Sequence, residues 1–299
     1  MSLVAFAELM TIAEQARYAV GYFESWNLES LLAAADAAEA ARSPVILGFS
    51  GIYLPHPGRA VRDPLAVYAA MGLAVCRSLS VPACLLFNES PHLPWVLDAI
   101  DAGFNLVMFT DEALSPGEHT AAVRRLCEKA HAAGCAVEAE MAPLPGVAGG
   151  LTGAPTDLRL TQPGPARAFV EQTGVDALAV NIGQLHLHGR RTVRLDLDRL
   201  ARLRQTISVP LVLHGASSID RDDLRQAIRL GVRKINVGSV LKQAYYNAMR
   251  AASAAVAPDA NPYEVIGSGL PADVLVAGRL AVRCVVEEWM ALCGSAGRG

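Results

Sequence analysis

Eight short apolar runs, separated by longer amphipathic segments, are the feature that most restricts what this chain can fold into. The runs are continuous rather than alternating, as expected of parallel strands buried on both faces, and helical patterns lie between them. Eight strand–helix units in one chain indicate a closed (β/α)8 barrel, a TIM barrel, more readily than an open sheet. The predicted strands are 18–23, 45–49, 82–87, 106–109, 136–141, 177–182, 210–214 and 234–237, and the clearest helices are 27–41, 65–78, 118–133, 197–206 and 221–230.

The composition allows one large core and excludes several classes of protein. With 299 residues and 52% hydrophobic content, the chain suits a single α/β barrel domain over 1–299 that ends in C-terminal helices. A net charge of −3 gives no reason to expect nucleic acid or an anionic membrane as a partner. No apolar run reaches the ~18 residues that a membrane span needs, and no signal peptide is apparent. The six cysteines show no metal-type spacing, so we expect buried free thiols and a cytoplasmic protein.

One irregular segment, 142–162, is rich in proline and glycine and is unusually long for a connection inside a compact barrel. Long loops of this kind are usually functional, so the segment is predicted to be a mobile active-site loop. The alternative is a surface insertion with no part in the site.

Polar residues stand where the apolar runs end, and in a barrel the chemistry lies at the C-terminal ends of the strands. Three histidines follow neighbouring strands, and two glutamates could project into the same cavity. Imidazole and carboxylate together suit zinc or another divalent ion. The alternative is that the histidines are hydrogen-bonded structural residues. The candidate metal ligands are His186, His188, His214, Glu89 and Glu140, and Ser50 at the end of the second run is a candidate substrate-binding residue.

A candidate anion site lies after the last two strands, where many barrels bind phosphate. The sequence there is Gly215-Ala216-Ser217-Ser218 and Asn236-Val237-Gly238-Ser239. Small residues let backbone N–H groups approach phosphate oxygens, and a helix N-terminus adds a favourable dipole. Ser218 and Ser239 could equally cap the following helices, and both roles are compatible because they use the same free N–H groups.

Beyond these patterns, the sequence resembles the class II fructose-bisphosphate and tagatose-bisphosphate aldolase family over nearly its whole length. The resemblance begins at Tyr18-Ala19-Val20-Gly21 and includes Val137-Glu138-Ala139-Glu140. It is densest in residues 173–180, in Val209-Pro210-Leu211-Val212-Leu213-His214-Gly215 and in Lys234-Ile235-Asn236-Val237.

The resemblance implies a TIM barrel and a divalent metal, usually zinc, that is held by three histidines and supplies Lewis-acid catalysis. Two of those histidines are kept, at His186 and His214. The phosphate-binding positions Gly215, Ser217 and Asn236 match the family, and Ser239 replaces a usual threonine. We expect a phosphorylated or polyhydroxy small-molecule substrate and a homodimer or homotetramer.

The departures from the family fall at the chemistry. Its strand-three motif, His-x-Asp-His-Gly, reads Leu86-Phe87-Asn88-Glu89-Ser90 here. Asn88 therefore stands where the family has a proton-transferring aspartate, and a neutral amide cannot act as a base. Glu89 replaces a metal-binding histidine but can still bind through oxygen. The rival expectation is that Glu89 turns away and His188 binds the metal instead.

Further replacements surround this motif. The family's lysine after the strand-six histidine is Arg190, which could hold phosphate through two hydrogen bonds. The loop over 143–155 contains no acidic residue, although the family's loop supplies one. The candidates to replace the missing proton-transfer groups are Glu24, Asp111, Glu112 and His188, and we expect Asn88, Asp111 and His188 at the reacting centre.

The sequence therefore predicts a metal-dependent, aldolase-like lyase that is inefficient on fructose 1,6-bisphosphate. One alternative is a different reaction on the same scaffold, such as decarboxylation or isomerisation through an enediolate, and another is a non-catalytic homologue. A coordinated change of three adjacent residues favours altered chemistry over loss of function.

Overall fold

The computed structural model describes residues 2–145, 159–185 and 192–299. Eight parallel strands close into a barrel in chain order, so the predicted TIM barrel is confirmed. All eight predicted strands are present, within three residues at either end. The strands are β1 (Val20–Ser25), β2 (Val45–Ser50), β3 (Ala83–Ser90), β4 (Leu106–Phe109), β5 (Ala136–Glu140), β6 (Ala177–Ala179), β7 (Leu211–Leu213) and β8 (Val232–Val237).

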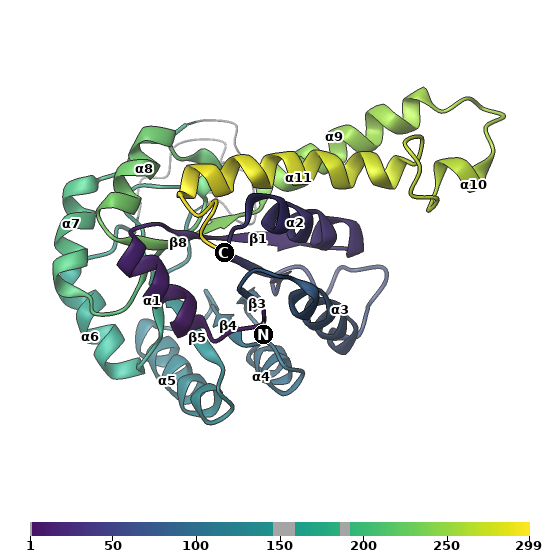
Figure 1. Cartoon of the computed structure of the whole chain (residues 1–299). Helices are drawn as coiled ribbons and strands as arrows, with labels where there is room; N and C mark the ends of the chain where they lie inside the picture. Colours follow the sequence, from purple (N-terminus) through teal and green to yellow (C-terminus); the bar gives the residue numbers. More distant parts are fainter. Residues whose placement is uncertain (1, 146–158, 186–191) are drawn as a thin grey trace.

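Helices on the outside of the barrel connect successive strands (Figure 1). Their ends follow local sequence signals: Asn27 and Ser30 form a reciprocal capping box at the start of α2, and Gly174 ends α6 in the left-handed conformation. The outer helices are α2 (Leu28–Ala41), α3 (Leu65–Ser78), α4 (Leu93–Asp101), α5 (Pro116–Ala132), α6 (Pro163–Thr173), α7 (Leu197–Thr206) and α8 (Arg221–Arg229), with a short 3-10 turn, η1 (Ala216–Ser218), after β7.

The inside of the barrel has an apolar lower part and a polar upper part. Tyr22, Leu86 and Val212 fill the lower part, which is closed by Phe6 and Met10 of the N-terminal helix α1 (Phe6–Ala16). A second, larger core lies between the strands and the surrounding helices. The apolar lower part leaves the C-terminal mouth as the place where buried polar side chains collect.

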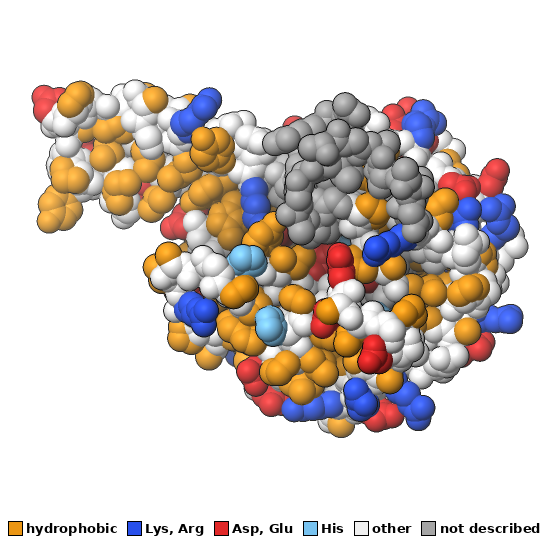
Figure 2. Space-filling view, turned by 180° about the vertical axis from the view of Figure 1, so that it is seen from behind, with side chains coloured by type: hydrophobic (Ala, Val, Ile, Leu, Met, Phe, Trp, Pro, Cys, Tyr) orange, Lys and Arg blue, Asp and Glu red, His pale blue; other side chains and the backbone are white. Residues whose placement is uncertain are grey.

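Three C-terminal helices extend away from the barrel. α9 (Ser239–Ala255) and α11 (Val274–Cys293) lie side by side, and α10 (Pro262–Val265) lies at their far end (Figure 1). Leu241 is the only residue of α9 that is buried, and hydrophobic side chains gather on the surface of this arm (Figure 2). The ion pair between Arg279 of α11 and Asp36 of α2, at 2.7 Å, helps to tie the arm's base to the barrel.

The cysteines are unpaired, and most of them are buried. Cys76, Cys84, Cys127, Cys135 and Cys293 are buried free thiols as predicted, whereas Cys284 is exposed because it lies on the outer face of α11. Within the described residues, no helix combines the length and the apolar character that crossing a membrane requires.

Candidate active site

A cavity of about 390 Å³ opens at the C-terminal mouth of the barrel. It is built from the ends of five strands and from the start of α9, as the position of polar residues at strand ends predicts. Many of the residues singled out from the sequence line it together. These are Ser50, Asn88, Glu89, His214, Gly215, Ser217, Asn236 and Ser239.

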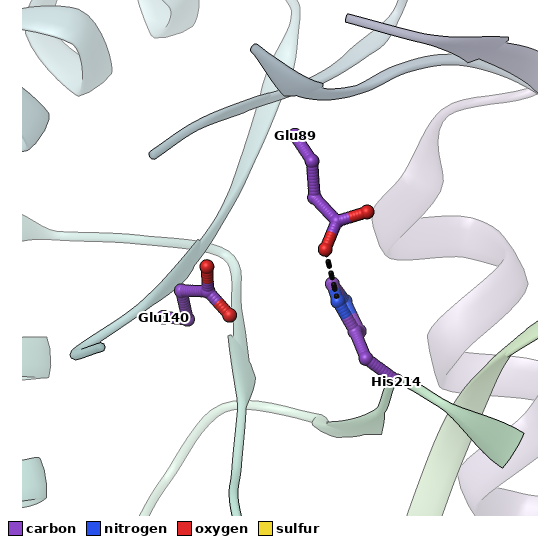
Figure 3. A group of neighbouring side chains, drawn as sticks. All are labelled: Glu89, Glu140 and His214. Carbon is purple, nitrogen blue, oxygen red and sulfur yellow. Dashed lines mark hydrogen bonds and ion pairs between the residues drawn. The ribbon is translucent and has the colours of Figure 1, made fainter. Parts of the chain in front are cut away.

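Glu89 has an unusual backbone conformation at the end of β3. The pairing of β3 with β4 shifts register between Phe87 and Ser90, and Glu89 between them has a φ of +52°. A non-glycine residue in this region costs about 1–3 kcal/mol and persists only where the surroundings hold it. The irregularity directs the Glu89 side chain to His214, at the end of β7 (Figure 3).

The His214 ring lies between two carboxylates. Its Nδ1 is 3.0 Å from Glu89 Oε1, and its Nε2 is 2.8 Å from Glu138 Oε1. Burial disfavours the charged ring, but Glu89 and Glu138 outweigh that effect and raise the pKa of His214 to about 10. With Nε2–H donated to Glu138, Nδ1 is the ring nitrogen that faces the cavity and Glu89.

Glu140 completes a group of three possible ligands with Glu89 and His214 (Figure 3). One ligand atom from each residue lies within 4.8 Å of the other two. Glu140 is buried and accepts a hydrogen bond of 2.8 Å from Thr110 Oγ1. Burial, opposed in part by His214, raises the pKa of Glu140 to about 7.

Beneath this group lies a fully buried ion pair. Lys234 Nζ of β8 is 2.8 Å from Glu138 Oε2 of β5, and both side chains are completely inaccessible to solvent. Burial favours the neutral acid, but Lys234 and His214 outweigh it and hold the pKa of Glu138 below its usual value. Burial lowers the pKa of Lys234, and Glu138 counteracts this. The pair supports His214 from below.

Asn88 and Asn236 connect Glu89 to Lys234 through hydrogen bonds. Asn88 Nδ2 donates to Glu89 Oε2 at 2.6 Å, and Asn236 Nδ2 donates to Asn88 Oδ1 at 3.3 Å. Lys234 in turn donates to Asn236 Oδ1. Both amides are almost fully buried, so their orientation is set by these partners.

Lys242 is the only lysine or arginine among the described residues that line the cavity. It stands in the first turns of α9, where Nζ lies 2.6 Å from Glu24 Oε1 and 4.3 Å from the centre of the Tyr53 ring. Burial raises the pKa of Glu24, and Lys242 offsets this only in part. An ammonium group has three donors, so pairing with Glu24 leaves others for a ligand.

The candidate proton-transfer residues are divided between two cavities. Asp111 and Glu112 line a separate cavity of about 250 Å³ that also contains Thr110 and Glu140, and Asp111 Oδ1 accepts from the backbone of Ala113 at 3.0 Å. Glu24 lines the same cavity as Glu89 and His214. The described residues therefore bring Glu24 beside Glu89 and His214, whereas Asp111 lines the cavity that contains Glu140.

Several sequence expectations lie outside the described residues. His186, His188 and Arg190 belong to this group, as does most of the predicted loop 142–162. Their proposed roles stay predictions.

Three contributors to the site were not identified from the sequence as functional. Glu138 shares the inward face of β5 with Glu140, and Lys234 shares that of β8 with Asn236. The two-residue spacing, together with a charge inside an otherwise apolar strand, is the signal that could have revealed them. Lys242 gives no comparable signal, because a lysine in an amphipathic helix is ordinary.

Comparisons with known proteins identify the family and the fold of this chain. Residues 4–298 match the family described as fructose-bisphosphate aldolase class-II. The YdjI aldolase from Escherichia coli K12 is 29% identical, with a TM-score of 0.79 over 99% of both chains. A putative fructose-1,6-biphosphate aldolase from Coccidioides immitis is 27% identical, with a TM-score of 0.79 over 98% of this chain and 97% of that one.

A fructose-bisphosphate aldolase from Campylobacter jejuni, at 18% identity, shares the fold with a TM-score of 0.79 over 100% of this chain and 97% of that one. The match to the family extends over nearly the whole sequence and includes every strand of the barrel. The chain therefore belongs to the class II fructose-bisphosphate aldolase family.

Proposed function

We propose that this chain cleaves and forms a carbon–carbon bond in a phosphorylated or polyhydroxy carbonyl compound, with a divalent metal, most simply zinc, held by Glu89, His214 and Glu140. Family membership makes the chain an aldolase-type lyase with a small sugar-phosphate substrate. The proposal adds the ligand set and the altered proton transfer. Decarboxylation, isomerisation and loss of catalysis gain no support, since the chain belongs to an aldolase family and two similar solved structures carry the name aldolase.

One observation carries the proposal: Glu89 Oε1 and His214 Nδ1, two atoms that bind metals, point at each other across 3.0 Å. Two carboxylates and an imidazole are a donor set that zinc accepts, and Glu138 fixes the second nitrogen of the ring as metal-binding histidines require. His186, outside the described residues, is the proposed fourth ligand. A bound divalent ion would act as a Lewis acid that polarises the substrate carbonyl.

Other residues of the site would orient the ligands and transfer protons. Glu138 holds His214 in one orientation, and Asn88 cannot take up a proton because its amide is neutral. Glu24 lines the same cavity as Glu89 and His214 and could exchange a proton with a substrate hydroxyl, with Lys242 at 2.6 Å to stabilise its anion.

Removing a ligand should remove the metal. His214→Ala and Glu89→Ala should lower bound zinc from about one equivalent per chain to a small fraction of that, because an incomplete ligand set binds zinc weakly. Inductively coupled plasma mass spectrometry of purified, dialysed protein measures this. His131→Ala and Glu128→Ala, which change the same residue types on the exposed face of helix α5, are matched controls. Full metal content in both site variants, or none in the wild type, would refute the ligand set.

We also propose that the cavity binds a phosphate group between residues 215–217 and 236–239, with Lys242 supplying positive charge. Lys242→Met should weaken binding of inorganic phosphate by about tenfold or more, since a hydrogen bond to a charged group contributes about 1.5–3 kcal/mol. Isothermal titration calorimetry gives the dissociation constant. Lys129→Met on α5 is the control with the same chemical change on an exposed lysine. Unchanged phosphate affinity in Lys242→Met would exclude this role.

A homodimer or homotetramer is the proposed assembly. The arm formed by α9, α10 and α11 exposes several large apolar side chains, and such patches commonly mark protein interfaces. They are Tyr246, Tyr263, Ile266, Leu270 and Leu280. A second copy of the chain is the proposed partner of this surface. The cytoplasm, where thiols stay reduced, remains the proposed location.

A further inference from the structure

The side chains around His214 form one closed circuit of hydrogen bonds and an ion pair. Five of its distances are 2.6 Å from Asn88 to Glu89, 3.0 Å from Glu89 to His214, 2.8 Å from His214 to Glu138, 2.8 Å from Glu138 to Lys234, and 3.3 Å from Asn236 to Asn88. The contact from Lys234 to Asn236 closes it. The circuit crosses the barrel through β3, β7, β5 and β8.

The donors in this circuit have a fixed direction. Lys234 has only donors, and it donates to Asn236. Each amide then accepts at its oxygen and donates from its nitrogen, so the series of donors ends at the Glu89 carboxylate. Asn88 is the last link, and its Nδ2 is the group that meets Glu89 Oε2. With Oε2 held by Asn88, Oε1 is the oxygen that faces His214.

We propose that Asn88 is the positioning residue for Glu89, and that the two replacements in the strand-three motif form one matched pair. The amide at position 88 holds the carboxylate at position 89 in the orientation that binds metal. This inference rests on the proposed metal site and deepens it. Asn88 therefore has a function of its own, the orientation of Glu89, in addition to marking the loss of the family's base.

The chemistry of the alternatives supports the pairing. An aspartate at position 88 could accept a hydrogen bond from Asn236, but its ionised carboxylate could not donate one to Glu89. The two carboxylates would then lie within hydrogen-bonding distance of each other, and their negative charges would repel. The family's Asp-His and this chain's Asn-Glu each carry one formal negative charge. The negative charge has moved from position 88 to position 89. The Asn88 amide now donates a hydrogen bond to the carboxylate at position 89.

The test is a zinc titration of metal-free, full-length protein against a competing chelator. Asn88→Ala should weaken zinc binding about 10–100-fold, the usual effect of removing a group that orients a ligand. Asn88→Leu, which keeps the branched side-chain skeleton without its polar atoms, should do the same and serves if the alanine variant folds poorly. Asn105→Ala is the matched control, because Asn105 also makes two short hydrogen bonds near a strand but lies at the opposite end of the barrel.

A double-mutant comparison separates positioning from a general structural effect. In the Glu89→Ala background, which lacks the carboxylate, adding Asn88→Ala should change zinc affinity by less than about threefold. An equal loss in both backgrounds would overturn the proposal, and so would Asn88 variants that bind zinc as tightly as the wild type. A wild-type protein that binds no zinc would instead refute the proposed metal site itself, and this inference with it.

Discussion

Purified protein supplied with zinc, cobalt or manganese should cleave fructose 1,6-bisphosphate and tagatose 1,6-bisphosphate at least about 100-fold more slowly than an ordinary class II enzyme. Aldol cleavage needs a base for the substrate hydroxyl proton and an acid that protonates the resulting carbanion. Asn88 cannot serve as the base, and residues 143–155 contain no acid. Each lost role costs about 10²–10⁴-fold, so the loss of both leaves little turnover on these two substrates.

Restoring the family motif should recover part of this activity. Asn88→Asp combined with Glu89→His returns both the base and the histidine ligand, and it should raise turnover of fructose 1,6-bisphosphate by at least about tenfold. Each single change should do less, because Asn88→Asp places two carboxylates side by side and Glu89→His leaves the neutral Asn88 where the family has its base. Restored turnover in the double variant would show that the rest of the cavity is competent.

A coupled assay that detects the triose phosphate products measures these rates, with an ordinary class II aldolase assayed in parallel. His214→Ala sets the background, since it removes a proposed ligand. Wild-type turnover within roughly tenfold of the ordinary enzyme would contradict the prediction, because the missing groups should cost more than that.

The barrel was predictable from the sequence because its strands are buried on both faces. Continuous apolar runs mark such strands even without neighbours, and the predicted helices 65–78 and 197–206 coincide with α3 and α7. β3 extends three residues beyond its apolar run, through Asn88-Glu89-Ser90, because the irregular pairing with β4 continues past Phe87. A hydropathy pattern cannot reveal that extension or the positive φ of Glu89.

The residues at the mouth of the barrel were predictable from the sequence, but the buried residues beneath them were less so. Residues that follow strands, such as His214 and Ser217, can be assigned to the mouth from topology alone. The partners of Glu138 could not be assigned, because Lys234 is distant in sequence and meets it only when β5 and β8 face each other across the closed barrel. The separation of Asp111 from this cavity likewise depends on the path of the chain after β4.

The buried pair of Glu138 and Lys234 should be the most sensitive point of the structure. Glu138→Leu or Lys234→Met alone should lower the free energy of unfolding by about 3–5 kcal/mol, because each removes one partner of an ion pair that water does not reach. The combined change, Glu138→Leu with Lys234→Met, should cost much less, since it removes both charges and fills similar volume with apolar groups. Urea denaturation of metal-free protein at neutral pH measures these differences. Glu128→Leu, at the exposed pair of Glu128 with Arg124, is the control and should change stability by about 0.5 kcal/mol or less.

Zinc affinity should not recover with stability in that double variant. Without the Glu138 carboxylate, His214 Nε2 has lost its acceptor, so the ring is no longer held with Nδ1 toward Glu89. Loss of such an orienting partner typically weakens metal binding about 10–100-fold. The combined variant should therefore be nearly as stable as the wild type but bind zinc poorly in the same chelator titration. If the combined variant bound zinc normally, Glu138 would be a structural residue only. If it were no more stable than either single variant, the buried charges would not be the source of the lost stability. The expected separation would show that this one carboxylate has two functions, neutralising Lys234 with Oε2 and orienting His214 with Oε1.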